Sequence, residues 1–190
     1  MPVADLIAVP NTPAAPRPRL GKLCIAIQAD QPGQLISRAE SALTDSHFIE
    51  LRLDGLQKPA NVLPRIKHFL ADRREATAIA TCRRKQNGGQ FTGTLAAQLE
   101  ILEGAAAAGC QIVDLEIESA EGAKASQINK LRASGAALLI SFHDYSRTRG
   151  LAQAADRIEA FKPDYVKVVS MARSLADNLA MLRLIEDRSQ

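Results

Sequence analysis

The sequence predicts an α/β protein of the (β/α)8 TIM barrel class, of which only about the first six β/α units are present. Three observations favour this fold. Strand-like and helix-like segments alternate along the chain, which is typical of a parallel sheet. Apolar and charged residues alternate inside the strand-like segments, so each strand has one polar face. The charges gather toward the C-terminal ends of these segments, where barrel enzymes place their chemistry.

Six segments are predicted to be strands because apolar, β-branched residues recur in them with period two. They cover residues 22–28, 48–54, 76–83, 112–118, 138–144 and 165–170. Helices are predicted between them, because apolar residues recur there at helical spacing. The helical sets are Val62, Ile66 and Phe69, then Leu95, Leu99 and Leu102, then Leu175, Leu179 and Leu182.

An open, doubly wound sheet is the alternative to the barrel. Its strands would be apolar on both faces, because helices cover both, whereas these strands carry charge on one face. Neither GxGxxG nor GxxxxGK[ST] follows the first strand, which weakens a nucleotide-binding interpretation. A closed barrel needs two strands more than the chain supplies. We therefore expect an incomplete barrel, the front part of a longer polypeptide.

The chain of 190 residues is long enough for one compact domain. We expect a flexible, Pro-rich leader over residues 1–20 and the incomplete barrel over residues 21–190. The net charge of +3 is mild and no Lys/Arg run is interleaved with aromatic residues, so no nucleic-acid partner is expected. No apolar run is long enough to span a bilayer, so no membrane association is expected.

The three cysteines, Cys24, Cys82 and Cys110, fall in or beside apolar segments and lack the paired spacing of metal ligands. Buried, reduced thiols are therefore expected, which agrees with a cytoplasmic location. The N-terminus also lacks the features of a secretory signal.

Lys167 is the strongest single candidate for a catalytic residue, because it lies in an otherwise apolar strand. Partial desolvation there would lower its pKa and expose a nucleophilic amine. Such amines form Schiff bases with carbonyl substrates. The alternative is a lysine that reaches solvent or an ion pair near the strand end.

His143 lies at the end of the preceding strand, with Ser141 one step below it on the same face. A neutral imidazole there could transfer protons near pH 7. A hydrogen-bonded structural histidine is the alternative, but the neighbouring lysine favours a catalytic one. His47 and His68 occur in turn-like or helix-like contexts and are expected at the surface.

Glu50, Arg52 and Asp54 are spaced by two residues and are expected to share one strand face. They would form either a buried ion network or a clamp for a hydroxylated, carboxylated ligand, with the guanidinium as a forked donor. By the same spacing Asp114, Glu116 and Glu118 share a face, and one of them is expected to support the lysine or the histidine.

Arg83 follows the third strand and leads into Gly88-Gly89, an arrangement that suits an anionic group. Arg84 and Lys85 are expected to be solvated surface residues. No metal site is expected, because the histidines are far apart and lie on different elements.

Five motifs fall in order on successive predicted strands. They are Glu50-Leu-Arg52-Leu-Asp54, Thr81-Cys-Arg83 leading to Gly88-Gly89, Asp114-Leu-Glu116, Ser141-Phe-His143-Asp144-Tyr145 and Val166-Lys167-Val168. Together, over about residues 22–187, they resemble type I 3-dehydroquinate dehydratase. The resemblance implies a (β/α)8 barrel and the conversion of 3-dehydroquinate to 3-dehydroshikimate in the shikimate pathway of aromatic amino-acid biosynthesis.

The resemblance also implies roles for individual residues. Lys167 would form an imine with the substrate ketone, and His143 would remove the neighbouring proton and later protonate the departing hydroxyl. Glu50, Arg52 and Arg83 match positions that hold the substrate. The residues expected to support the site are Asp114, Glu116, Asn87 and Ser141. No metal or organic cofactor is needed.

The sequence departs from the family pattern in three places. Asn87 stands where the family usually has a glutamate that orients the catalytic histidine. Ala26 stands where many members have a substrate-binding serine. The family's last two strands, with an arginine for the substrate carboxylate and a closing loop, have no counterpart here.

The family also implies possible partners, namely a second copy in a homodimer and a shikimate dehydrogenase domain fused after the barrel. Three alternatives stay open: a non-catalytic module that binds a shikimate-pathway metabolite, an inactive fragment of a bifunctional dehydroquinase/shikimate dehydrogenase, and another Schiff-base barrel such as an aldolase.

Overall fold

The computed structural model describes residues 17, 18 and 20–188, so most of the leader expected over residues 1–20 lies outside the described residues. The strands are β1 (Ile25–Gln28), β2 (Phe48–Arg52), β3 (Thr77–Thr81), β4 (Ile112–Glu116), β5 (Ala137–Asp144) and β6 (Tyr165–Ser170). The helices are α1 (Pro32–Ala42), α2 (Leu63–Ala71), α3 (Leu95–Ala107), α4 (Ile117–Gly122), α5 (Ala125–Arg132), α6 (Leu151–Glu159) and α7 (Leu175–Arg188). Short 3-10 turns are η2 (Leu53–Gly55), η3 (Pro59–Val62) and η4 (Lys85–Asn87).

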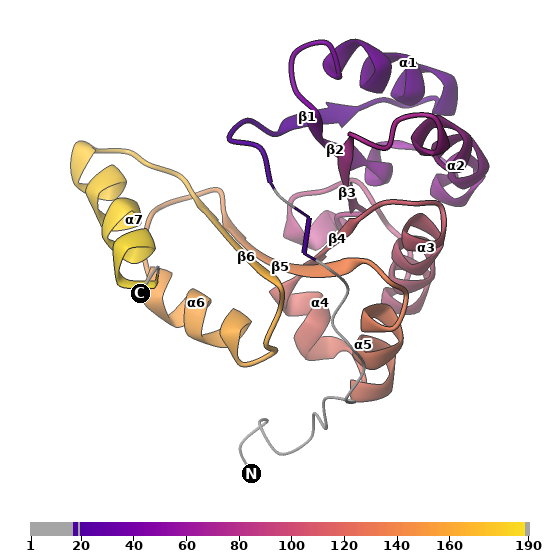
Figure 1. Cartoon of the computed structure of the whole chain (residues 1–190). Coiled ribbons are helices and arrows are strands. Elements are labelled where there is room, and N and C mark those ends of the chain that lie inside the picture. Colours follow the sequence, from indigo (N-terminus) through magenta and orange to yellow (C-terminus); the bar gives the residue numbers. More distant parts are fainter. Residues whose placement is uncertain (1–16, 19, 189–190) are drawn as a thin grey trace.

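The strands pair in chain order from β1 to β6, and each neighbouring pair is parallel. A doubly wound sheet would reverse its strand order partway along, so this order contradicts the open-sheet alternative. The sheet curls, and the helices lie along its outer side (Figure 1). The prediction of a (β/α)8-type barrel with six units is therefore confirmed.

Two apolar layers cover the two faces of the sheet. Strand residues alternate between them, because successive side chains point to opposite faces. The larger layer packs the sheet against the helices and includes Ile49, Leu51, Val113, Leu115 and Ile140. The smaller layer lies on the inner face and contains Phe48, Ile79, Ile112, Ala137 and Leu139. This inner layer forms an apolar floor beneath the polar residues at the C-terminal ends of the strands.

All three cysteines are free thiols. Cys82 and Cys110 are buried as expected, whereas Cys24 is only half-buried. Burial is the main reason why the pKa of Cys24 is raised to about 11 and that of Cys110 to about 12. These thiols are therefore protonated and unreactive near neutral pH.

Two strands end earlier than predicted, and this changes where two acids lie. Asp54 belongs to η2 rather than to β2, and Glu118 belongs to α4, which begins at Ile117. The expectation that Asp114, Glu116 and Glu118 share one strand face is therefore wrong for Glu118. The alternating pattern continues through Ile117 and hides the point at which the backbone turns into a helix.

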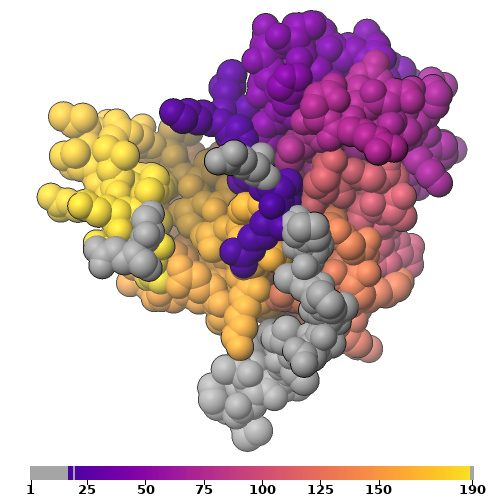
Figure 2. Space-filling model, in the orientation of Figure 1, coloured from indigo at the N-terminus to yellow at the C-terminus, as the bar shows by residue number. Residues whose placement is uncertain are grey.

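The C-terminal unit is the least buried part of the described chain. Leu175, Leu179 and Leu182 are at helical spacing as predicted, but they are 74%, 47% and 61% exposed. Ion pairs between Arg188 and two acids of α6, Asp156 and Glu159, hold α7 in place at 2.6 Å each. In Figure 2 this segment, coloured yellow, forms one end of the molecule. Among the described helices, none has the length and apolar character needed to cross a membrane.

The buried core and the exposed surface of α7 can be compared by truncating one leucine in each. We expect Leu102→Ala in α3, where the side chain is fully buried, to lower the free energy of unfolding by about 2–5 kcal/mol through lost burial and a residual cavity. The matched change Leu182→Ala in α7 should alter it by about 0.5 kcal/mol or less. Urea unfolding followed by circular dichroism measures both. Equal losses would contradict this assignment of the core.

Candidate active site

Polar side chains from five neighbouring strands meet above the apolar floor. The strands are parallel, so their C-terminal ends lie at the same end of the sheet. Register pairs Thr81 with Asp114, Glu116 with Ser141, and Ser141 with Lys167. Residues that lie far apart in the sequence are thereby brought into one hydrogen-bonded network.

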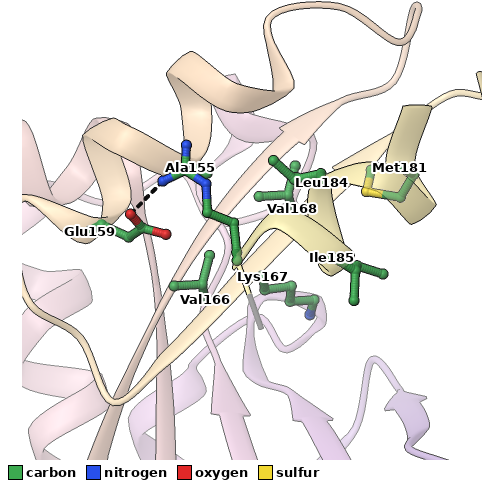
Figure 3. Close-up of a pocket in the computed structure, with 9 residues that line it drawn as sticks. Ala155, Glu159, Val166, Lys167, Val168, Met181, Leu184 and Ile185 are labelled. Atoms are coloured by element: carbon green, nitrogen blue, oxygen red, sulfur yellow. Dashed lines mark hydrogen bonds and ion pairs between the residues drawn. The ribbon is translucent and has the colours of Figure 1, made fainter. Parts of the chain in front are cut away.

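Lys167 enters this network from β6. Its Nζ lies 3.1 Å from Glu50 Oε2 and 3.3 Å from Asp114 Oδ2. Its side chain points away from Ala155 and Glu159 of α6 (Figure 3) and is 27% exposed. The amine therefore faces the interior of the curled sheet, and it is ion-paired there.

The expected lowering of the Lys167 pKa is wrong. Burial does lower it, but attraction to the Asp114 and Glu50 carboxylates outweighs burial and raises the pKa above its ordinary value of 10.5. The apolar neighbours in the sequence indicated only the burial. The two carboxylates come from β4 and β2, and periodicity could not identify them as the partners of this lysine.

Asp114 connects the lysine to Arg83, which lies just past β3 and is 2% exposed. Arg83 Nη2 donates to Asp114 Oδ2 at 2.9 Å, the same oxygen that faces Lys167. Ser141 Oγ donates to Asp114 Oδ1 at 2.5 Å. The buried Asp114 carboxylate thus pairs with two cations and accepts from one hydroxyl. A carboxylate that is removed from water needs charge-assisted hydrogen bonds of this kind.

His143 is held by Arg83 on one side only. Arg83 Nη1 lies 2.7 Å from His143 Nε2. A guanidinium carries donors and no acceptor, so Nε2 must accept and the proton of the neutral ring must sit on Nδ1. Nδ1 is buried without a hydrogen-bond partner among the described residues.

The environment of His143 keeps its imidazole neutral. Burial first, and then the positive charges of Arg83 and Lys167, lower its pKa from 6.5 to about 3. Lys167 and His143 therefore act on each other electrostatically although they belong to different strands. The ring is therefore in its neutral, proton-accepting form at physiological pH, and it is a weak base while both cations lie beside it.

Glu116 supports the site by holding the backbone and the guanidinium at the end of β3. Its Oε1 accepts from the backbone N–H of Arg84 at 2.9 Å and lies 3.7 Å from Arg83 Nε. Its Oε2 accepts from Gln98 Nε2 at 2.6 Å. Burial is the main cause that raises the pKa of Glu116, and these hydrogen bonds oppose it.

Sequence reasoning missed Gln98, and it gave Thr81 no role although this residue begins one of the five motifs. Gln98 is fully buried on α3 and also accepts from Ser119 Oγ at 2.9 Å. The available signal was a polar residue beside Leu95, Leu99 and Leu102 on a helix face expected to be apolar. Thr81 donates to Glu50 Oε1 at 2.8 Å and so orients the carboxylate that faces Lys167.

The three residues expected to share a face on β2 divide between two tasks. Glu50 joins Thr81 and Lys167, as described above. Arg52 instead forms a bidentate pair with Asp54, with both hydrogen bonds at 2.9 Å. Asp54 also accepts from the backbone N–H of Gln90 at 3.1 Å, which ties the loop after β3 to the end of β2. The hydrogen bond with Asp54 is the main cause that raises the pKa of Arg52.

Asn87 contacts a neighbouring helix rather than the imidazole. Its Nδ2 donates to Glu118 Oε2 at 2.9 Å, while its Oδ1 is buried without a hydrogen-bond partner among the described residues. His47 and His68 are exposed as expected. Lys85 is exposed as well, whereas Arg84 is half-buried because its backbone binds Glu116.

The curled parallel sheet and the inward-facing Lys167 place this protein in the class of barrel proteins that carry a lysine in their interior. The model of the family "Type I 3-dehydroquinase" matches residues 23–190, so the chain belongs to the type I 3-dehydroquinase family. A curated relative, 3-dehydroquinate dehydratase from Desulfotalea psychrophila, is 29% identical over 169 residues, which cover 87% of this chain and 71% of the relative. The resemblance recognised in the five motifs is thereby confirmed.

Solved structures agree with the fold. The crystal structure of 3-dehydroquinate dehydratase from Geobacillus kaustophilus superposes with a TM-score of 0.76 at 21% identity and covers 86% of this chain and 67% of its own. The dehydroquinate dehydratase and shikimate dehydrogenase of S. pombe AroM superposes with a TM-score of 0.65 at 25% identity and covers 88% of this chain and 34% of its own. A relative that carries both activities in one protein is therefore known.

The shared carboxylate can be tested through the lysine it faces. We expect Asp114→Asn to lower the pKa of Lys167, because the largest favourable charge beside the ammonium is removed. NMR titration of protein with isotope-labelled lysine side chains measures this pKa. Asp45→Asn, which changes an exposed carboxylate between α1 and β2, is the matched control and should leave the titration unchanged. An unaltered titration in Asp114→Asn would contradict the assigned contact.

The depressed pKa of His143 predicts a pH dependence of stability. The unfolded chain binds a proton on this imidazole below about pH 6.5 whereas the folded chain does so only near pH 3, so the contribution of His143 to stability is lost as pH falls through this window. Arg83→Gln should raise the His143 pKa toward 6.5. NMR titration of the imidazole measures it, and a ring that titrates at 6.5 in the unaltered protein would refute the assignment.

Proposed function

We propose that this chain carries the catalytic half of a lyase site that dehydrates 3-dehydroquinate to 3-dehydroshikimate through a Schiff base on Lys167. The single observation that carries the proposal is the interior network in which Asp114 joins Lys167 to Arg83, and Arg83 contacts His143. It brings an amine and a neutral imidazole into one partly dry chamber. Membership of the dehydroquinase family supports the reaction and the substrate class.

Lys167 must lose a proton before it can attack a ketone, because the nearby carboxylates hold it as the ammonium. Glu50 faces Nζ at 3.1 Å and is placed to accept that proton. The free amine then adds to the carbonyl carbon, and the resulting hydroxyl leaves as water with the proton that Glu50 accepted, which leaves a cationic imine. The imine draws electrons from the adjacent carbon and acidifies its C–H bond. The raised pKa thus makes deprotonation of Lys167 part of the reaction.

His143 would accept the proton from that adjacent carbon. Its pKa near 3 in the free site keeps the ring neutral but makes it a weak base, and withdrawal of the Arg83 charge would raise that pKa toward the range of an effective general base. Arg83 occupies the Nε2 lone pair in the free site, so an anionic or hydroxyl group of the substrate must draw the guanidinium away first. The imidazolium then returns its proton to the departing hydroxyl as the C–O bond breaks. Hydrolysis of the imine finally releases the product and restores the amine.

Glu50, Arg52 and Arg83 would hold the polar groups of the substrate. Asp114 and Glu116 flank the Arg83 guanidinium and keep it in the site when a substrate oxygen replaces His143 as the partner of Nη1. Asp114, Glu116 and Ser141 hold these groups in place. Asn87 holds the loop after β3 against α4 through Glu118.

The proposal extends to the organisation of the protein. The leader expected over residues 1–20 lies almost wholly outside the described residues, and the partial barrel that follows it is proposed to function in the cytoplasm. We further propose that the protein forms a homodimer and that a shikimate dehydrogenase domain is fused to the barrel. The two-activity relative from S. pombe supports the fusion.

Borohydride trapping tests the Schiff base directly. Incubation with 3-dehydroquinate and borohydride should add a covalent mass to the peptide that contains Lys167, because reduction fixes the imine. Lys167→Ala should abolish the adduct, and Lys130→Ala, which changes a lysine that is 69% exposed, should retain it. Peptide mass spectrometry gives the readout. Binding of 3-dehydroquinate without any adduct would favour the non-catalytic module instead.

The variant His143→Ala separates imine formation from elimination. It should keep a trappable adduct and slow elimination by about two orders of magnitude or more, because only proton transfer is removed. Release of 3-dehydroshikimate, followed by its ultraviolet absorbance, measures elimination.

A further inference from the structure

Tyr145 touches the imidazole of His143 but has no role in the reaction proposed above. The two ring centroids lie 5.6 Å apart with an interplanar angle of 28°, a stacked arrangement. Tyr145 is nevertheless 51% exposed. A large aromatic side chain left half in water gains little from burial, so its contact with His143 needs another explanation.

The loop after β3 is shaped around the Tyr145 ring. Gly88 follows η4 with φ of +79°, in the left-handed region that favours glycine. A Cβ atom at this position would lie 2.3 Å from Cε2 of Tyr145. Only a glycine therefore lets the ring lie against this loop and over the imidazole.

The turn after β5 holds Tyr145 from its own side. Asp144 Oδ1 accepts from the backbone N–H of Ser146 at 2.8 Å and from that of Arg147 at 3.2 Å. The carbonyl of Asp144 accepts from the backbone N–H of Met171 at 2.9 Å, just past β6. The backbone on both sides of Tyr145 is thereby fixed to the strand end that carries His143.

The imidazole has little else to define its orientation. Arg83 binds Nε2, and Nδ1 has no hydrogen-bond partner among the described residues. Histidines that act in catalysis are usually oriented through their second nitrogen. A single hydrogen bond leaves the ring free to rotate about its axis, and a stacked neighbour removes that freedom.

We propose that Tyr145 is a positioning residue, whose ring sets the plane of the His143 imidazole in place of a hydrogen bond to Nδ1. The inference rests on the proposed role of His143 as the proton acceptor. A misplaced base transfers a proton more slowly even when its pKa is unchanged. Tyr145 therefore acts on elimination and leaves the imine on Lys167 intact.

Two variants of Tyr145 and an imidazole NMR signal test this proposal. In Tyr145→Leu the ring-current shift of the His143 carbon-bound protons should disappear, and elimination should slow by about tenfold to a hundredfold with the trapped adduct retained. Tyr145→Phe should restore the ring-current shift and most of the rate. Gly88→Ala should displace the ring and reproduce the leucine variant.

Tyr165→Leu is the matched control, because it removes the tyrosine at the opposite, N-terminal end of β6. It should leave the His143 resonances unchanged even if it lowers stability. Unchanged His143 resonances in Tyr145→Leu would overturn the positioning role. Loss of the shift with an unaltered elimination rate would overturn it as well. Absence of an adduct in the unaltered protein would instead refute the proposed function, and the NMR comparison would still decide the position of the ring.

Discussion

The buried carboxylate of Asp114 is the contact on which the rest of the site depends. One of its oxygens faces both the Lys167 ammonium at 3.3 Å and the Arg83 guanidinium at 2.9 Å, and the other accepts from Ser141. With Asp114 only 1% exposed, removal of its charge would leave two cations close together with little solvent to screen them. The carboxylate therefore fixes the charge on the lysine and holds Arg83 against His143, whose neutral state results first from burial and then from the charges of Arg83 and Lys167.

The barrel geometry explains why such a carboxylate can exist. Parallel strands in sequential order bring their C-terminal ends together, and alternation sends every second side chain to the inner face. The apolar floor below excludes water, while Thr81 and Gln98 orient the carboxylates of Glu50 and Glu116. Buried charge is acceptable here because nearly every charged group has a partner.

Periodicity along the sequence was sufficient to predict the strands and the polar inner face, and it placed Lys167 and His143 on neighbouring strands; the contacts of Arg83 with His143 and Asp114 come from the structure. It could not predict the sign of the Lys167 pKa shift, because that sign depends on carboxylates from β2 and β4 at contact distance. It also missed Gln98, which supports the site from a helix. The exposure of Leu175, Leu179 and Leu182 could not be read from their spacing either, because a helical pattern does not tell whether another layer covers it.

The two edge strands of the curled sheet, β1 and β6, leave one side of it open, and this opening is a further physical constraint on the site. Within the described residues β1 and β6 each pair with one strand only, and α7 presents leucines to solvent. The site lies close to this open side, since Lys167 is on β6, which is joined to the sheet by its ladder with β5 and by the ion pairs of Lys167 with Glu50 and Asp114. A double-mutant cycle between Asp114→Asn and Lys167→Met, read as the free energy of unfolding, tests that network most directly. Our account predicts a coupling of about 1–3 kcal/mol between the two changes, and strictly additive effects would contradict it.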